Sequence, residues 1–439
     1  MRRRDVLAGL AGAAGAIGVY GAASVLTSGD PGSYEPLGSV DLEGTRELVS
    51  SDDGSTAFLA VDDGIATVDC STPSDPTVLA ERRGVLADDP DGPLGLVWDV
   101  SLSGDRLLAA GPAQPVPGSA LQAALLFDVA DPADPQLLDV YSTEFPIHNC
   151  YLEDGYAYLT AYDGEGNPLV ICDAGDGVLT EVGRWSLFDH DPAWSDVHTA
   201  LRQLHDVTVQ DGVAYLPYWD AGTYLVDVSD PTAPSYLGHT SVRGRSAMTD
   251  VGLVEIQRGL LAPPGNSHFV TPDESGDLIA VGREAWAVPQ GDCSVGGPAG
   301  IDLYDASDPT EITHHATIDP PESYANTRSG WFTTAHNVDL RDGRCYSSWY
   351  FGGVKVHDVS NPGAPEELTW WRKPEETSFW TAQHAVPGEY FLASSADDAA
   401  GYADSIPGRV YVFPDREGRQ PNAPELTAPP EGEQRLREC

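Results

Sequence analysis

Lysine is almost absent from this sequence: of its 24 lysine and arginine residues only Lys355 and Lys373 are lysines, against 68 aspartates and glutamates. The formal net charge of −44 argues against partners that need basic patches, namely nucleic acids and anionic membrane surfaces. An acidic surface stays soluble by self-repulsion, which dense salt screens, because the Debye length falls to about 3 Å at 1 M. The composition therefore favours a salt-adapted protein, with an acidic protein of a low-salt organism as the alternative.

The motifs of several common chemistries are missing as well. The sequence has no CxxC metal knuckle, no phosphate-binding loop, no dinucleotide fingerprint and no Ser-His-Asp order. It shows no convincing amphipathic helix of three turns, and after residue 26 no segment is apolar enough to cross a membrane. These absences leave an all-β fold without a familiar catalytic signature.

The N-terminus has the pattern of an export signal. Arg2, Arg3 and Arg4 precede an apolar run of small residues that reaches Leu26, and Arg-Arg-x-x-Leu before such a run resembles a twin-arginine signal. We expect residues 1–30 to be this signal or, where it stays uncleaved, an N-terminal membrane anchor. The resemblance implies an extracytoplasmic protein, either secreted or anchored at the cell surface.

One sequence motif recurs along the rest of the chain, and its clearest copy spans residues 205–234. It opens with an alternating, strand-like run, turns at Asp-Gly, and ends in Asp-x-Ser-Asp-Pro. Related openings lie at Leu48, Trp98, His148, His268, His336 and His384. Seven units, about 48 to 68 residues apart and each with four short strands, predict an all-β, seven-bladed β-propeller of four-stranded antiparallel blades.

The two ends of the repeat predict how the ring closes. Residues 34–42 match the fourth strand of a unit although no unit precedes them, and the last unit ends after its third strand at 410–413. We therefore expect the N-terminal strand to complete the last blade, which leaves no exposed sheet edge. The propeller is predicted to span 34–415, followed by a disordered acidic tail at 416–439.

The repeated motif resembles the repeat of the LVIVD-repeat proteins, of haloarchaeal type. The resemblance is clearest at residues 225–231 (Leu-Val-Asp-Val-Ser-Asp-Pro). The resemblance implies a propeller but says little about chemistry, because fold does not imply function. A more distant likeness, of architecture and histidine placement alone, is to the selenium-binding/methanethiol oxidase propellers. That likeness implies histidines and copper at the central channel.

The cysteines divide into two groups when each is compared with its counterparts in the repeat. Four occupy apolar positions and are predicted to be buried: Cys70, Cys150, Cys172 and Cys345. The other two, Cys293 in an insertion and Cys439 at the C-terminus, have no counterpart. We do not expect a disulfide framework, because most of the cysteines are accounted for by packing.

Five histidines share one position, the start of the innermost strand of a blade: His148, His205, His268, His336 and His384. Equivalent positions lie at equal height, so these side chains should ring one mouth of the channel. Imidazole is the commonest metal ligand, so the ring predicts a site for copper, zinc or iron. The alternative is that each histidine bonds to backbone or to channel water.

Other residues complete this predicted mouth. Trp98 takes the same position in the second blade, and Glu47 or Leu48 takes it in the first. His190 and His198 lie in the long connection that leads into His205, and we expect them to reach over the mouth as accessory ligands. The alternative for these two is a solvated loop.

The long insertions are expected to lie on the same face as the histidines. They occupy 110–122, 187–204, 242–267, 283–299, 319–335 and 396–408, at junctions that emerge where first strands begin. Long loops usually carry function, and aromatic side chains with arginine suit an organic or anionic ligand. The predicted ligand face consists of Trp98, Trp194, Trp286, Trp331, Arg283 and Arg328. The alternative is that the aromatics only pack the loops onto the sheets.

Three functions remain open at this point. The first is a monomeric binding or interaction module, with a small-molecule or protein ligand on the insertion face. The second is a metal-dependent enzyme, in particular a copper oxidoreductase, that uses the histidine ring. A calcium-dependent hydrolase would need a ring of carboxylates and asparagines, for which Glu47, Asn149 and Asn337 are scant support. The binding module is favoured because no residue is forced into a catalytic role.

Overall fold

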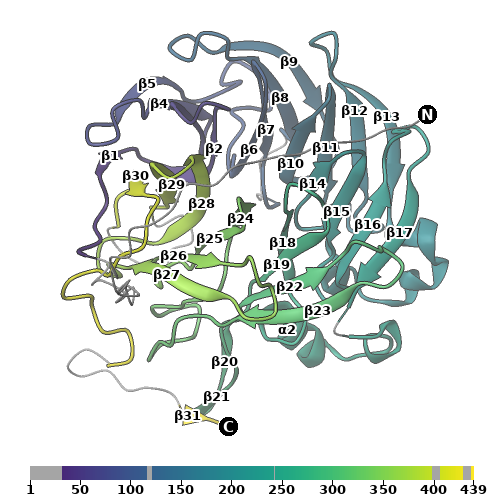
Figure 1. Ribbon diagram of the computed structural model, residues 1–439. Coiled ribbons are helices and arrows are strands. Elements are labelled where there is room, and N and C mark those ends of the chain that lie inside the picture. The colour runs from purple at the N-terminus through teal and green to yellow at the C-terminus, as the bar shows by residue number, and fades with distance from the viewer. Residues whose placement is uncertain (1–31, 116–120, 242, 398–405, 429–436) are drawn as a thin grey trace, which may run out of the picture. The chain divides into compact units, whose positions relative to one another are not determined.

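The protein is a seven-bladed β-propeller. A computed structural model describes residues 32–439 except 116–120, 242, 398–405 and 429–436, so the predicted signal at 1–30 lies outside the described residues. In the described part, seven four-stranded antiparallel sheets succeed one another around a central axis (Figure 1). The first strands of neighbouring blades contact each other around the ring and therefore line the axis. The predicted fold class is confirmed.

Each blade runs from its inner to its outer strand in chain order, except in the last. The first three blades are β2 (Thr45–Ser50), β3 (Thr56–Val61), β4 (Ile65–Asp69), β5 (Thr77–Arg82); β6 (Asp99–Ser103), β7 (Arg106–Gly111), β8 (Ala123–Asp128), β9 (Gln136–Ser142); and β10 (Ile147–Glu153), β11 (Tyr156–Ala161), β12 (Leu169–Asp173), β13 (Thr180–Trp185). The fourth and fifth are β14 (Thr208–Gln210), β15 (Val213–Pro217), β16 (Thr223–Asp227), β17 (Ser235–Thr240); and β18 (Ser267–Pro272), β19 (Leu278–Arg283), β22 (Ile301–Asp305), β23 (Thr313–Ile318). The sixth and seventh are β24 (Val338–Arg341), β25 (Arg344–Ser348), β26 (Val354–Asp358), β27 (Glu366–Trp371); and β28 (Phe379–Val386), β29 (Tyr390–Ser395), β30 (Arg409–Pro414), β1 (Gly38–Asp41).

The N-terminal strand closes the ring, as expected. Strand β1 pairs antiparallel with β30, with Ser39 opposite Tyr411 and Val40 opposite Val410. The last blade is thereby built from both ends of the propeller, in agreement with the prediction from the incomplete seventh repeat. Pairing of the two ends covers what would otherwise be an open sheet edge.

The apolar core lies between neighbouring blades. One cluster joins Leu108 and Leu126 of the second blade to Leu152 and Leu159 of the third, and all four side chains are buried. The middle strands are apolar on both sides because each sheet is covered by a blade on either face. Packing of blade against blade therefore stabilises the ring as a whole.

The repeated Asp-Pro turns seal the outer contacts between blades. In the fourth blade, Asp227 Oδ1 accepts from the backbone N–H and the hydroxyl of Ser229 at 2.9 and 2.6 Å, the turn chemistry expected from the repeat. In the third, fourth and seventh blades the fourth strand has a glycine that the turn of the next blade approaches. A Cβ on Gly238 would lie 1.6 Å from the carbonyl oxygen of Pro309, and one on Gly183 would lie 2.0 Å from that of Pro231. These strands need glycine because the neighbouring backbone fills the space of a side chain.

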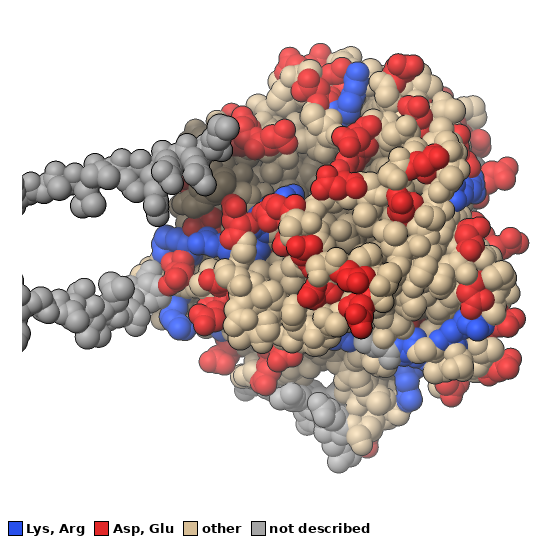
Figure 2. Space-filling model, turned by 45° about the vertical axis from the view of Figure 1, so that its right-hand side comes forward, with Lys and Arg blue, Asp and Glu red and all other residues tan. Residues whose placement is uncertain are grey.

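Helices occur only in the insertions of the described part. They are α1 (Leu187–His190), α2 (Leu253–Leu261) and the 3₁₀ turns η1 (Pro192–Asp196), η2 (Thr199–Arg202) and η3 (Arg245–Ala247). None of the helices in the described residues has the length and apolar character needed to span a membrane. Acidic side chains are spread over the face in Figure 2 and outnumber basic ones.

The segment after the last blade is ordered where it is described, contrary to the expected disorder of 416–439. Arg419 forms a bridge with Ser33, the Arg372 N–H donates to Gln420 Oε1 at 3.0 Å, and Leu426 is buried. The composition did not indicate this order because the stabilising contacts come from residues distant in sequence. Residues 416–428 therefore make specific contacts that their composition did not indicate.

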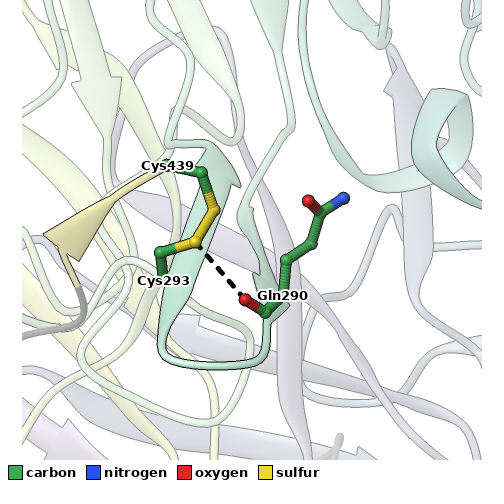
Figure 3. Close-up of a disulfide and its surroundings, with 3 residues drawn as sticks. All are labelled: Gln290, Cys293 and Cys439. Atoms are coloured by element: carbon green, nitrogen blue, oxygen red, sulfur yellow. Dashed lines mark hydrogen bonds between the residues drawn. A yellow bond between two sulfur atoms is a disulfide. The ribbon is translucent and has the colours of Figure 1, made fainter.

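A disulfide ties the C-terminus to an insertion of the fifth blade. Strand β31 (Arg437–Glu438) pairs in parallel with β21 (Cys293–Gly296), which itself pairs with β20 (Ala287–Gln290), and Cys293 is bonded to Cys439 (Figure 3). This single disulfide joins the two cysteines that have no counterpart in the repeat, and the expectation of no disulfide framework did not include it. The other four cysteines are free and buried, as predicted.

Candidate functional site

The seven inner strands each bring one side chain to the same mouth of the central channel. In several blades a β-bulge interrupts the ladder at this position, between Thr45 and Leu48 in the first and between Ile147 and Cys150 in the third. Bulges are frequent next to active sites because they redirect side chains. Matched through the strand pairing, the residues at this position are Arg46, Trp98, His148, His205, His268, His336 and Trp380.

Four of the five predicted histidines come together there. The ring centroids of His148 and His205 are 4.0 Å apart, those of His205 and His268 are 4.0 Å apart, and those of His268 and His336 are 4.6 Å apart. All four side chains are buried. We call His148, His205, His268 and His336 the histidine cluster.

The fifth predicted histidine, His384, lies outside the cluster, and Trp380 takes its place. The Trp380 ring is 4.3 Å from the His336 ring, whereas His384 pairs with Phe391 deeper in the blade and contacts Tyr346. The prediction failed because it matched one histidine to another. Counting back from the turn glycine of each hairpin excludes His384, because His336 precedes Gly343 by seven positions and His384 precedes Gly388 by four.

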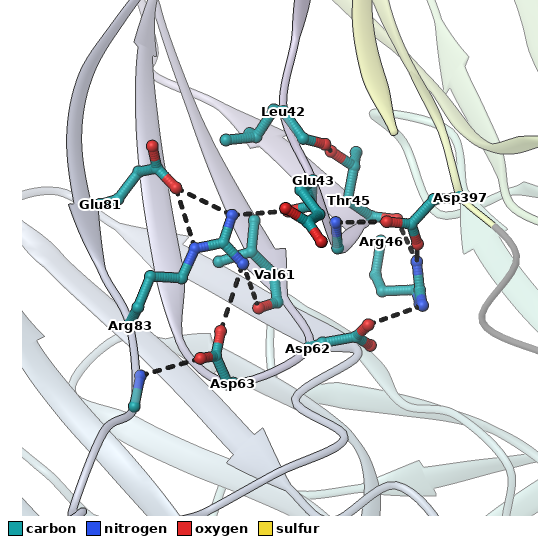
Figure 4. A network of polar contacts seen from close by, with 12 residues as sticks. Leu42, Glu43, Thr45, Arg46, Val61, Asp62, Asp63, Glu81, Arg83 and Asp397 are labelled. Atoms are coloured by element: carbon teal, nitrogen blue, oxygen red, sulfur yellow. Dashed lines mark hydrogen bonds and ion pairs between the residues drawn. The ribbon is translucent and has the colours of Figure 1, made fainter. Parts of the chain in front are cut away.

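The first blade contributes a cation to the mouth. Arg46 lies 5.7 Å from the Trp380 ring centroid and forms ion pairs with Asp62 at 3.0 Å and Asp397 at 2.8 Å (Figure 4). The sequence interpretation placed Glu47 or Leu48 here because the bulge adds a residue that spacing alone does not reveal. The Arg46 side chain is fully buried, and its two carboxylates are partly exposed.

The histidine cluster is held in its neutral form. Burial lowers the pKa of His148 to about 4 and that of His336 to about 3. The pKa of His205 and that of His268 fall well below the usual range, first through burial and then through repulsion by neighbouring imidazoles. Neutral imidazole is the form that binds metals.

The hydrogen bonds divide the cluster into two pairs. His336 Nδ1 contacts the Trp380 carbonyl oxygen at 2.6 Å, and His148 Nδ1 contacts Asn149 Oδ1. The buried Nδ1 atoms of His205 and His268, by contrast, have no hydrogen-bond partner within the described part of the chain. Buried polar atoms are rarely left without a partner, so this pair has capacity for a bound group.

A carboxylate that sequence reasoning missed joins this second pair. Glu284 follows strand β19 at its mouth end, and its Oε2 lies 3.6 Å from His268 Nε2. Ligand atoms of His205, His268 and Glu284 all lie within 4.8 Å of one another. The Tyr350 hydroxyl donates to Glu284 Oε1. Burial raises the pKa of Glu284 to about 7, while Arg328 opposes that rise.

A second layer of polar side chains lies one residue further along the inner strands. Glu47, Asp99 and Asp206 are buried, and their pKa values are raised by burial; the charge of Asp99 raises those of Glu47 and Asp206 further. Asn337 Nδ2 donates to Glu47 Oε2. Asp99 and Asp206 were missed because the repeat has varied residues there. We call Glu47, Asp99 and Asp206 the acidic layer.

Two adjoining hollows, of about 340 and 450 Å³, open above the histidine cluster, and together we call them the mouth cavity. Five long insertions contribute to its walls, through residues such as Gln114, Thr199, Leu260, Trp286 and Arg328. The Arg328 guanidinium lies over the Trp286 ring, 4.4 Å from its centroid. The cavity therefore combines neutral imidazoles, aromatic rings and a cation.

Only part of the predicted ligand face lines this cavity, namely Trp98, Trp286 and Arg328. Arg283 instead forms an ion pair with Asp302 at 3.0 Å. Trp194 is buried against Tyr224, and Trp331 packs on Tyr324. For these two tryptophans the alternative of loop packing describes the contacts.

Neither accessory histidine reaches the cluster. His190 stacks on Tyr236 of the outer strand β17, with centroids 3.8 Å apart. His198 caps the 3₁₀ turn η2, where its Nδ1 accepts from the Ala200 N–H. Some residues of a long connection can lie at the mouth while others fold back toward the outer strands. The sequence of the connection does not indicate which residues do so.

Comparison with known families identifies the repeat. The family model described as the LVIVD repeat matches residues 202–241, which include the fourth blade. The predicted LVIVD resemblance is confirmed, and the chain carries this repeat. The haloarchaeal type and the likeness to selenium-binding propellers stay predictions.

Solved structures share the propeller architecture. The β-propeller domain of Cps50 (Swd1) from Myceliophteria thermophila is 11% identical, with a TM-score of 0.57 over 87% of this chain and 99% of that chain. The WD40 β-propeller domain of Doa1 is 12% identical, with a TM-score of 0.52 over 88% and 98%. A chain of the mitotic checkpoint complex is 11% identical, with a TM-score of 0.53 over 87% and 95%. At these identities the likeness shows the fold alone. No curated protein matches the sequence.

Proposed function

For this seven-bladed propeller with its LVIVD repeat, we propose the function of an exported binding module that takes a small organic anion into the mouth cavity. The propeller fold with its LVIVD repeat suggests a binding or interaction module, and the proposal adds the face and the ligand chemistry. The observation that supports this proposal most directly is that five separate insertions border one cavity above the histidine cluster. Ligand pockets are typically concave, mostly apolar and furnished with a few convergent polar groups.

The walls of the mouth cavity favour a flat, negatively charged ligand. Trp98, Trp286 and Trp380 offer aromatic faces, and Arg328 lies beside Trp286. An anion would be attracted by the guanidinium, while neutral imidazoles would donate hydrogen bonds without adding charge. The overall charge of −44 gives nucleic acid no electrostatic attraction.

The ligand proposal is tested with 1-anilinonaphthalene-8-sulfonate, an aromatic anion, titrated into the full-length protein in concentrated salt. Trp286→Ala and Arg328→Ala should each weaken binding roughly 5- to 30-fold, through the loss of about 1–2 kcal/mol. The matched control is Arg372→Ala, because Arg372 stacks on Trp370 at 3.7 Å on the outer part of the sixth blade. Equal losses in the cavity variants and the control would contradict the proposed face.

Export rests on the sequence of the N-terminus. Exchange of Arg3 and Arg4 for lysine should retain the protein inside a host that has the twin-arginine route, while Arg2→Lys serves as the control. Export that survives the double exchange would remove this part of the proposal. The acidic composition further predicts an unfolding midpoint that rises with added KCl, since salt screens repulsion between carboxylates.

A metal-dependent enzyme is the second candidate function. It is favoured by the convergence of His205, His268 and Glu284, which differs from the five-histidine ring expected from the repeat. In the described residues no other set of three histidine, cysteine or acidic side chains is as compact, the acidic layer included. The calcium-dependent alternative therefore has less support than a transition-metal site.

A further inference from the structure

We infer that His205, His268 and Glu284 form a binding site for a divalent transition metal of zinc type on the floor of the mouth cavity. The inference goes beyond the proposed function because it holds whether or not an organic anion binds above. Two imidazoles and one carboxylate, with a further position open, are a ligand set of zinc and of iron(II). The set lacks the thiolate and thioether ligands that select copper(I).

The distances suit such an ion. A tetrahedral zinc site with bonds of about 2.1 Å places its ligand atoms about 3.4 Å apart. His268 Nε2 and Glu284 Oε2 are already 3.6 Å apart, and the three ligand atoms lie within 4.8 Å of one another. Side-chain rotations that shorten the longest separation by up to about 1.4 Å would close the remaining gap.

The surroundings of Glu284 leave one of its oxygens available. Tyr350 donates to Oε1, and Oε2 is the oxygen that faces His268. A hydrogen bond to the second oxygen of a ligating carboxylate fixes its orientation, as outer-shell partners do in metal sites. Tyr350 is therefore a positioning residue for the proposed site.

The charge balance around the site also favours a cation. The acidic layer of Glu47, Asp99 and Asp206 lies one residue further along the inner strands. Buried carboxylates without a counter-ion are costly, and a nearby divalent cation would reduce that cost.

His148 and His336 flank the proposed ligands without belonging to them. In the described residues, the ring nitrogens of these two histidines are not part of the compact set of ligand atoms that His205, His268 and Glu284 form. An ion bound at the predicted set would retain an open coordination position. That position would face the cavity, because His205 and Glu284 line both of its hollows.

The test is zinc binding by the untagged full-length protein after chelator treatment in concentrated salt, with cobalt(II) as the spectroscopic probe. We expect one zinc per chain and visible cobalt bands of a four- or five-coordinate site. His268→Ala and Glu284→Gln should weaken zinc binding more than about 100-fold, and Tyr350→Phe about 10- to 100-fold, the range of outer-shell losses. The matched control His384→Ala, an inner-strand histidine outside the cluster, should bind as the wild type does.

Three outcomes would overturn the inference. They are no stoichiometric zinc, zinc binding that persists in both His268→Ala and Glu284→Gln, or loss of binding in His148→Ala while Glu284→Gln is unaffected. Glu284→Gln keeps the side-chain shape, and an unchanged near-ultraviolet spectrum would show that it folds. When the anilinonaphthalene probe is titrated into the chelator-treated protein, failure of one proposal is distinguishable from failure of the other.

Discussion

Replacing Glu284 by glutamine should stabilise the metal-free protein above neutral pH and leave its stability unchanged in mild acid. Burial raises the pKa of Glu284 from its ordinary value of 4.5 to about 7. Below pH 4.5 the carboxyl is protonated in both the folded and the unfolded chain. Between pH 4.5 and 7 only the unfolded chain releases the proton, so stability falls as the pH rises, and above pH 7 the full penalty remains.

The size of the effect follows from the two pKa values. Their difference of about 2.5 corresponds to about 3 kcal/mol, at about 1.4 kcal/mol for each pH unit. Glutamine carries no such penalty and can still accept from Tyr350. The buried histidines destabilise the folded protein as the pH falls below 6.5, but they do so equally in both proteins, so the comparison isolates Glu284.

The assay is denaturant unfolding followed by tryptophan fluorescence, with chelator and constant salt, at pH 5, 6, 7 and 8. The glutamine variant should exceed the wild type by about 3 kcal/mol at pH 8 and by little at pH 5. A difference that is the same at pH 5 and pH 8, or a wild type that is the more stable at pH 8, would refute the reasoning. Zinc added at pH 8 should raise the stability of the wild type and not that of the variant.

Three further predictions concern the propeller itself. Gly238→Ala should destabilise by about 1–3 kcal/mol in thermal unfolding, because its Cβ would meet a carbonyl of the next blade, whereas Gly244→Ala, with no atom within 4 Å, should not. Cys293→Ser with Cys439→Ser should lower the unfolding free energy by about 2–4 kcal/mol and abolish the effect of added reductant, unless the pairing is wrong. Arg46→Met should lower the free energy of unfolding, measured with denaturant, by about 1–3 kcal/mol. The expected loss is moderate because the two carboxylates that pair with Arg46 are partly exposed. An unchanged free energy of unfolding would mean that these ion pairs contribute nothing to stability.

The repeat predicted the fold and the position of the mouth residues, because equivalent strands must place equivalent residues at one height. His205 and His336 could be assigned for this reason, although 131 positions separate them. A bulge hid Arg46 in the first blade, and in the last blade His384 was matched to the other histidines although Trp380 occupies the position. Counting from the turn glycines would have excluded His384 but would not have identified Trp380, which lies at a bulge.

The residues outside the repeat could not be predicted in the same way. Glu284 belongs to an insertion, and only the folding of that insertion over the channel brings it to His268. The pairing of Cys293 with Cys439 depends in the same way on where the C-terminal segment returns. Such contacts are set by three-dimensional packing and leave no periodic signal in the sequence.

The pairing of β1 with β30 has a consequence for how the protein is made. The first strand of the propeller has no partner strand until residues 409–412 have left the ribosome. Strand β1 therefore stays unpaired while the blades between it and β30 are synthesised. Domains usually fold as units during synthesis, and this one cannot close its ring before its last blade has emerged. A nascent chain stalled before the last blade would therefore hold an unsealed ring, open to chaperones and proteases.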